Sequence, residues 1–93
     1  MTTVTLQVGN SDDKLKQVEW ALFIADVARE VEQAGVVHFH GLSHGAAMWQ
    51  NACWIVDVDD EDNLKTLKDR TSQLGMKYKQ ESIAWTEGTT QFI

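Results

Sequence analysis

The chain has 93 residues, 43% of them hydrophobic and 24% charged, with a formal net charge of −6 at pH 7. This length predicts one domain, residues 1–93, with a real core. The acidity counts against a direct nucleic-acid binder, which needs a basic surface, and favours a basic protein partner. The single cysteine excludes an internal disulfide, no apolar run is long enough to span a bilayer, and no leader is recognisable, so we expect no membrane contact and a cytoplasmic location.

The first predicted element is a half-buried strand. Val4, Leu6 and Val8 alternate with polar residues, so they would point to one side of a sheet. The dipeptide Gly9-Asn10 ends the strand.

A long helix is predicted next. Ser11, followed by two aspartates, is typical of a helix N-terminus, and the helix is expected to run to about Ala34, before Gly35. At 100° per residue its apolar arc is wider than one sheet face requires, which indicates a second contact. The arc as predicted consists of Val18, Trp20, Ala21, Ile24, Ala25, Ala28 and Val31. The residues expected to serve self-association are Trp20, Leu22 and Phe23.

Two further strands are predicted, at residues 36 to 42 and 48 to 58, with a turn at 43 to 45. In the first, Val37 and Phe39 should share one face and His38 and His40 the other. In the second, one face is expected to hold Ala52, Trp54, Val56 and Val58, and the other Trp49, Asn51, Cys53, Ile55 and Asp57.

The acidic run at residues 59 to 62 predicts the capped start of a second helix. Its apolar stripe consists of Leu64, Leu67, Thr71 and Leu74, before Gly75. Residues 82 to 86 predict a fourth strand, and a turn at Glu87-Gly88 would allow a short fifth strand over residues 89 to 93.

The resulting order, β-α-β-β-α-β, predicts an α+β ferredoxin-like sandwich with two helices on one face of an antiparallel sheet. The other face is left open, and we expect it to be a binding surface. Its candidate residues are His38, His40, Trp49, Asn51, Cys53 and Ile55.

Several site chemistries are disfavoured by the pattern. His38 and His40 have the i, i+2 spacing found at some metal sites, and Cys53, His44 or Asp57 could supply a third ligand. No metal-binding motif accompanies them and no carboxylate is interleaved at ligand spacing, so we expect no metal and no cofactor. Cys53 lies mid-strand, away from any helix N-terminus that would activate a thiol. The acidic run lacks the glycine and terminal glutamate of a calcium-binding loop, and no glycine-rich phosphate loop is present.

Three stretches resemble counterparts in small uncharacterised proteins from bacteria and their phages. They are residues 9–15, residues 49–54 and residues 80–85. The resemblance implies no activity, but it favours an accessory or phage-encoded protein that acts on a host partner.

The sequence therefore predicts a non-catalytic, self-associating binding protein that binds and inhibits a host partner, such as a defence system. One alternative is a binder of a nucleotide-like ligand, with Trp49 stacking on a base and Asn51, His38 and His40 supplying hydrogen bonds. A second alternative is a small ferredoxin-like dimeric enzyme with His38 or His40 as general base.

Overall fold

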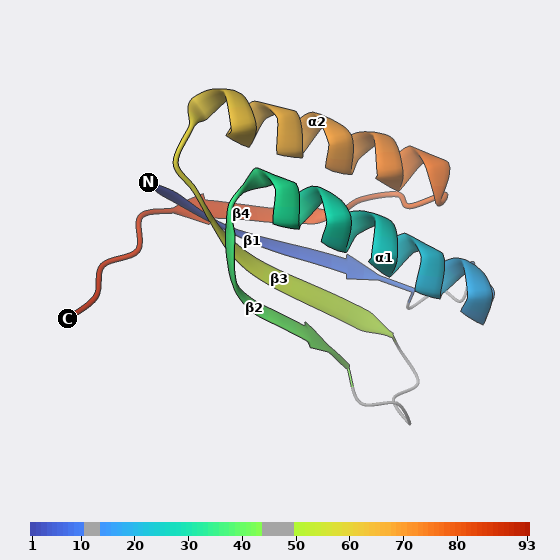
Figure 1. Ribbon diagram of the computed structural model, residues 1–93. Helices are drawn as coiled ribbons and strands as arrows, with labels where there is room; N and C mark the ends of the chain where they lie inside the picture. The colour runs from blue at the N-terminus through green and yellow to red at the C-terminus, as the bar shows by residue number, and fades with distance from the viewer. Residues whose placement is uncertain (11–13, 44–49) are drawn as a thin grey trace.

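A computed structural model describes residues 1–10, 14–43 and 50–93. Six elements follow one another in the chain (Figure 1): β1 (Thr2–Gly9), α1 (Gln17–Ala34), β2 (Val36–Leu42), β3 (Asn51–Val58), α2 (Glu61–Lys77) and β4 (Ala84–Gly88). The strands form one antiparallel sheet in the order β2-β3-β1-β4, and both helices lie on the same side of it. The α+β ferredoxin-like layout predicted from the sequence is therefore confirmed.

The two central strands separate a helix-covered face from an uncovered one. β1 and β3 pair over their whole length, from Thr2 opposite Val58 to Gly9 opposite Asn51. Residues directly opposite each other share a face of the sheet, so the apolar residues of β1 and those of β3 lie on the same face. The covered face carries the apolar residues predicted for it, all at most 3% exposed: Val4, Leu6, Val8, Ala52, Trp54, Val56 and Val58.

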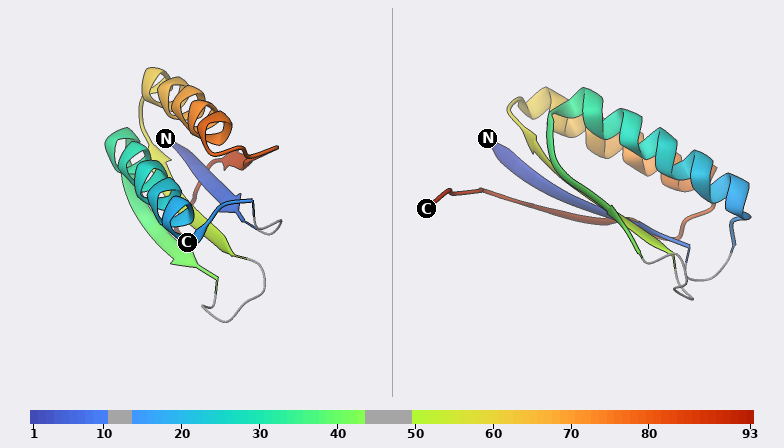
Figure 2. Two further views of the ribbon diagram at one scale, coloured as in Figure 1. Left: turned by 90° about the vertical axis from the view of Figure 1, so that its right-hand side faces the viewer. Right: turned by 60° about the horizontal axis from the view of Figure 1, so that its bottom comes forward.

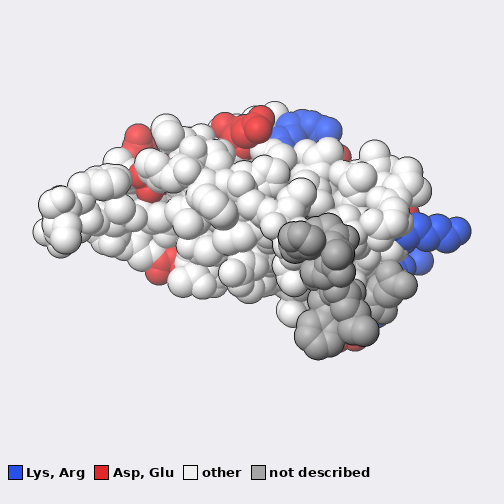
Figure 3. Space-filling view, turned by 90° about the horizontal axis from the view of Figure 1, so that it is seen from below, with Lys and Arg blue, Asp and Glu red and all other residues white. Residues whose placement is uncertain are grey.

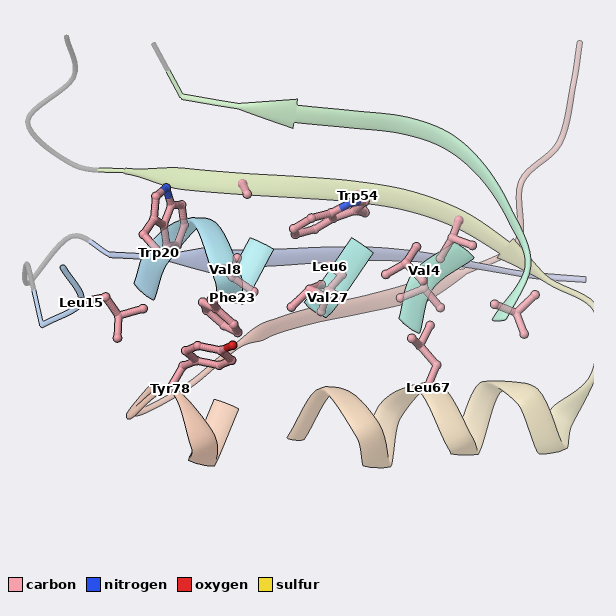
Figure 4. Close-up of a cluster of buried hydrophobic side chains, with 14 residues drawn as sticks. Val4, Leu6, Val8, Leu15, Trp20, Phe23, Val27, Trp54, Leu67 and Tyr78 are labelled. Carbon is pink, nitrogen blue, oxygen red and sulfur yellow. The ribbon is translucent and has the colours of Figure 1, made fainter. Parts of the chain in front are cut away.

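Helix α1 packs on this core through an arc that matches the predicted one only in part. Trp20 and Val31 are buried as predicted, and Ile24 and Ala28 pack against the core. Phe23 and Val27 are also buried, whereas Val18 is 67% exposed. Ala21 and Ala25 are exposed as well. The helix is apolar over most of its circumference, and the arc that meets the sheet is the one with the two aromatic rings, whose burial removes the most apolar area from water (Figure 4).

This placement corrects the predicted self-association site. Trp20 is 7% exposed and Phe23 is 0% exposed, so both belong to the core of their own chain and offer little surface to a second copy. Leu22 is the only one of the three that is exposed, and its role stays a prediction.

The start of α1 is held by one side chain before the helix, Asn10, and one in its first turn, Glu19. The Asn10 carboxamide accepts from the Leu15 N–H at 3.0 Å and donates to its carbonyl oxygen at 3.0 Å. The Glu19 carboxylate accepts from the N–H of Lys16, the N-cap residue, at 3.0 Å. The helix therefore begins later than expected, and the predicted cap Ser11 lies outside the described residues.

Helix α2 begins as the acidic run predicts, because the Asp60 carboxylate accepts from the Asp62 N–H at 2.7 Å. Its inner face contains Leu67 and Thr71, as predicted, but the helix continues past Gly75 to Lys77. The next residue, Tyr78, stacks on Phe23 with ring centroids 4.8 Å apart and so joins the C-terminal end of α2 to α1.

The C-terminal part of the chain contains one strand, not a hairpin. β4 runs through the expected turn at Glu87-Gly88 and pairs with β1 from Gln7 opposite Ala84 to Thr3 opposite Gly88. Residues 89–93 form no strand in the structure as described; they leave the sheet edge as an extended tail (Figures 1 and 2).

Candidate open-face site

The uncovered side of the sheet, called the open face below, differs from the prediction because β2 contains a bulge. Val37 lies opposite Val56, but Phe39 lies opposite Ile55, so His38 is an extra residue on the β2 side. A bulge shifts the alternation by one residue. Phe39 is therefore on the open face and His40 on the helix face, the reverse of what was predicted for both.

Each of these rings has a defined place. The imidazole of His40 lies parallel to the indole of Trp54, with centroids 4.7 Å apart and an interplanar angle of 6°. The Phe39 ring folds over Gly41, where a Cβ atom would lie 2.6 Å from a ring carbon. Gly41 is thus the one sequence signal compatible with this arrangement, although it does not by itself predict the bulge.

A hydrogen-bonded cluster occupies one end of the open face. The Thr3 hydroxyl donates to Asp57 Oδ1 at 2.6 Å, and His38 Nε2 contacts the other carboxylate oxygen. Asp57 is only 7% exposed, and His38 is 40% exposed. The Thr3 hydrogen bond and then the His38 contact hold the pKa of Asp57 below its usual value, because both favour the carboxylate.

The tail reaches the same cluster. The Thr90 hydroxyl is hydrogen-bonded to the Thr3 hydroxyl, and the Phe92 ring meets the His38 ring edge-on, with centroids 6.4 Å apart. The tail therefore crosses the end of the open face from β4 past β1 toward β2. Sequence reasoning had no signal for Thr3, Thr90 or Phe92, since these contacts join residues far apart in the chain.

The order of groups in this cluster bears on its chemistry. The carboxylate of Asp57 binds the Thr3 hydroxyl through one oxygen and the His38 imidazole through the other, and no hydrogen bond between the imidazole and the hydroxyl is found among the described residues. A nucleophile–base pair needs that contact. Over residues 1–10, 14–43 and 50–93, no three histidine, cysteine or acidic side chains are grouped so that they could hold a metal ion.

The rest of the open face is uncharged. Among the described strand residues on this side, Asp57 is the only one of the types Asp, Glu, Lys and Arg. Figure 3 looks at the molecule from this side and shows mostly uncharged surface, with charged side chains near its margins. Apart from Asp57, the face consists of Thr3, Thr5, Gln7, Gly9, Val36, His38, Phe39, Gly41, Asn51, Cys53, Ile55, Ala84, Thr86 and Gly88.

The predicted site residues are distributed along this face and do not converge. Ile55 lies opposite Thr5 near its middle. Asn51 and Cys53 line a hollow of about 290 Å³ at the end remote from Asp57. His38 is at the Asp57 end, His40 is on the other face, and Trp49 lies outside the described residues.

A second hollow, of about 260 Å³, lies between α2 and residues 80–85. Trp85 and Ile83 form part of its wall, and the Lys68 amine lies 5.7 Å from the centre of the Trp85 ring. Thr71 also lines it, and its buried hydroxyl has no hydrogen-bond partner. The hydroxyl is not accessible from the hollow, so it offers a ligand nothing as it stands.

Comparisons with known proteins add no family. No family model, curated protein or solved structure matches the chain. None of the helices in the described part of the chain is long and apolar enough to cross a membrane. The functional argument therefore depends on the geometry of the open face.

Proposed function

We propose that this protein is a non-catalytic binding module that self-associates by packing the open faces of two copies against each other. The observation that carries the proposal is the charge distribution. The chain has 22 charged residues of types Asp, Glu, Lys and Arg, yet the strand residues of the open face include only Asp57. A sheet face that meets water usually carries charged and polar residues, whereas the core of an interface is depleted of charge.

The apolar side chains on this face also support the proposal. Phe39 is 51% exposed, and Val36 is exposed beside it on β2. Ile55 is half-buried in the next strand. Together these residues make an apolar band across β2 and β3, and such a band on a small protein is a common mark of an interaction site.

A second copy is a suitable occupant because it carries the same uncharged surface. In a symmetric dimer the same surface of each copy forms the contact. An uncharged face therefore meets an uncharged face, and neither needs a complementary charge. A net charge of −6 on each copy opposes association over long range, and an uncharged contact surface places that charge away from the interface.

The basic protein partner expected from the net charge fits the same arrangement. Asp59, Asp60, Glu61 and Asp62 are exposed where α2 begins, on the helix side of the molecule. Pairing of the open faces would leave these carboxylates in water, where they would attract a basic surface.

Introduction of a charge at the middle of the face tests the proposal. Thr5 is on the central strand β1, opposite Ile55 on one side and Thr86 on the other. Thr5→Lys should convert a dimer to a monomer in sedimentation equilibrium, because the ammonium group would lose its hydration inside the interface. Because Thr5 is not on an edge strand, this result would also distinguish face-to-face packing from pairing of edge strands.

The matched control is Leu22→Lys, which puts the same side chain on the exposed side of α1. It should leave the dimer unchanged. If Leu22→Lys dissociates the protein and Thr5→Lys does not, the interface is on the helix and the proposal is wrong.

A further inference from the structure

The tail formed by residues 89–93, called the arm below, exposes two large apolar side chains. Phe92 is 81% exposed and Ile93 is fully exposed. The contacts described for the arm are the Thr90–Thr3 hydroxyl pair and the edge of the Phe92 ring against His38. Burial of large apolar side chains removes apolar area from water, so a further contact would stabilise the arm.

The hollow at the far end of the open face is a suitable receptor for an aromatic ring. On the open face its wall consists of the Phe39 ring, which is 51% exposed, with Gly41 and Cys53 beside it. Its volume is about 290 Å³. An apolar cavity of about 150 Å³ is enough to hold benzene, so a phenyl ring fits.

In the structure, Phe92 lies outside the hollow of its own chain. With Thr90 hydrogen-bonded to Thr3, the Phe92 ring meets the edge of His38 and stays 81% exposed. A second copy offers the ring another approach to the hollow.

Consider two copies whose open faces pack against each other, with a twofold axis between the faces and perpendicular to the strands. The strands of one copy then run in the opposite direction to those of the other. The arm end of each sheet then lies over the hollow end of the other, and both contacts form at once. This inference rests on the proposed self-association and specifies its geometry. We propose that the arm of each copy binds the open face of the other, with Phe92 in the hollow lined by Phe39, Gly41 and Cys53.

The size of the sheet indicates why an arm is needed. Strands of eight, seven, eight and five residues present roughly 450 Å² of flat sheet, at about 3.3 Å per residue and about 4.8 Å between strands. A standard stable interface takes about 800 Å² from each partner. Side chains roughen the sheet and enlarge its accessible area, and the Phe92 and Ile93 side chains supply a further part of the difference.

The native Cys53 in the wall of the hollow provides a direct test. In a Phe92→Cys variant of the full chain, the new thiol of one copy should lie near Cys53 of the other. Mild oxidation should give a covalent dimer on non-reducing gels, with peptide mapping showing a bond between positions 92 and 53. The double variant Phe92→Cys/Cys53→Ser should lose this bond, and Thr89→Cys should not form it.

A second measurement separates the arm from the interface as a whole. Phe92→Ala should weaken dimerisation roughly tenfold to a hundredfold in sedimentation equilibrium, as should Phe39→Ala, and the double variant should cost less than the two separate effects combined. If Phe92→Ala has no effect and the 92–53 bond does not form while Thr5→Lys still dissociates the dimer, the arm proposal is wrong and the self-association stands. If the wild-type protein is a monomer, both are wrong.

Discussion

The imidazole ring of His40 lies flat on the indole ring of Trp54, at the edge of the sheet next to the helices. Trp54 is 1% exposed, and β2 is the edge strand beside it, so the exposed His40 covers the tryptophan from solvent. The pair explains how a polar residue on an edge strand can belong to the helix side of the sheet.

This contact predicts a modest loss of stability in His40→Ala. The free energy of unfolding should fall by about 0.5–1.5 kcal/mol, the usual contribution of a stacked ring pair. Urea unfolding monitored by circular dichroism measures it. Tryptophan fluorescence provides a second readout, because removal of the His40 ring changes the surroundings of the Trp54 indole. His38→Ala is its matched control, since it removes an imidazole two residues away that does not stack on the indole. A change in tryptophan emission of equal size in both variants would contradict the assignment of His40 to the helix side.

Gly35 predicts a much larger effect. A Cβ atom at this position would overlap the carbonyl oxygen of Asp57 and lie 2.9 Å from its carbonyl carbon. The backbone of Gly35 is extended, with φ of −178°, so the cost is steric and not conformational. Gly35→Ala should therefore lower the free energy of unfolding by about 2–3 kcal/mol, because two backbone segments must separate.

Gly88→Ala is the control for that substitution. Nothing lies within 4 Å of the position that its Cβ would occupy, so stability should change by less than about 0.5 kcal/mol. Equal thermal midpoints for the two alanine variants would show that α1 does not join β2 next to the β3 backbone as described.

Tyr78 predicts a specific loss of stability at alkaline pH. Its hydroxyl donates to Asp26 at 2.6 Å, and burial, followed by this hydrogen bond, raises the pKa of Tyr78 to about 12. The folded state thus favours the neutral phenol. Its contribution is fully present below about pH 10, the pKa of an unfolded tyrosine, and is lost as the pH rises through about 12.

The Tyr78→Phe variant should lose about 1.5 kcal/mol at pH 7, because the charge-assisted hydrogen bond to Asp26 is absent. Between pH 10 and pH 12 its stability should fall less steeply than that of the wild type. Chemical unfolding at several pH values measures both effects, and parallel curves across this interval would count against the buried position of Tyr78.

Asp57 predicts the opposite dependence, at acidic pH. The Thr3 hydrogen bond and the His38 contact lower its folded pKa, so its contribution is fully present above about pH 4 and is lost as the pH falls through the lowered value. Thr3→Val removes the larger of these two causes and should raise the pKa of Asp57 toward its ordinary value. A carboxyl titration by NMR measures this, and an unchanged value in Thr3→Val would mean that the hydroxyl does not donate to Asp57 in solution.

The sequence predicts some of these elements well for physical reasons that apply locally. Strict alternation at Val4, Leu6 and Val8 identifies the buried side of β1, and the Asp60 cap identifies the start of α2. The phase of α1 is not predictable in the same way, because apolar residues surround most of the helix and only the sheet decides which arc is buried.

The site is less predictable than the fold. The bulge at His38 exchanges the faces of Phe39 and His40, and no turn residue or charge in β2 signals it. The cluster of Thr3, Asp57 and His38 depends on strand pairing across the sheet, which residue spacing along the chain does not contain.

Native mass spectrometry of the wild-type protein at micromolar concentration, compared with its denatured mass, tests the central claim most directly. Self-association through the open face predicts a species of twice the 10.5 kDa chain mass, with no added mass from a ligand or metal. A species at 10.5 kDa alone, over the whole concentration range, would contradict it.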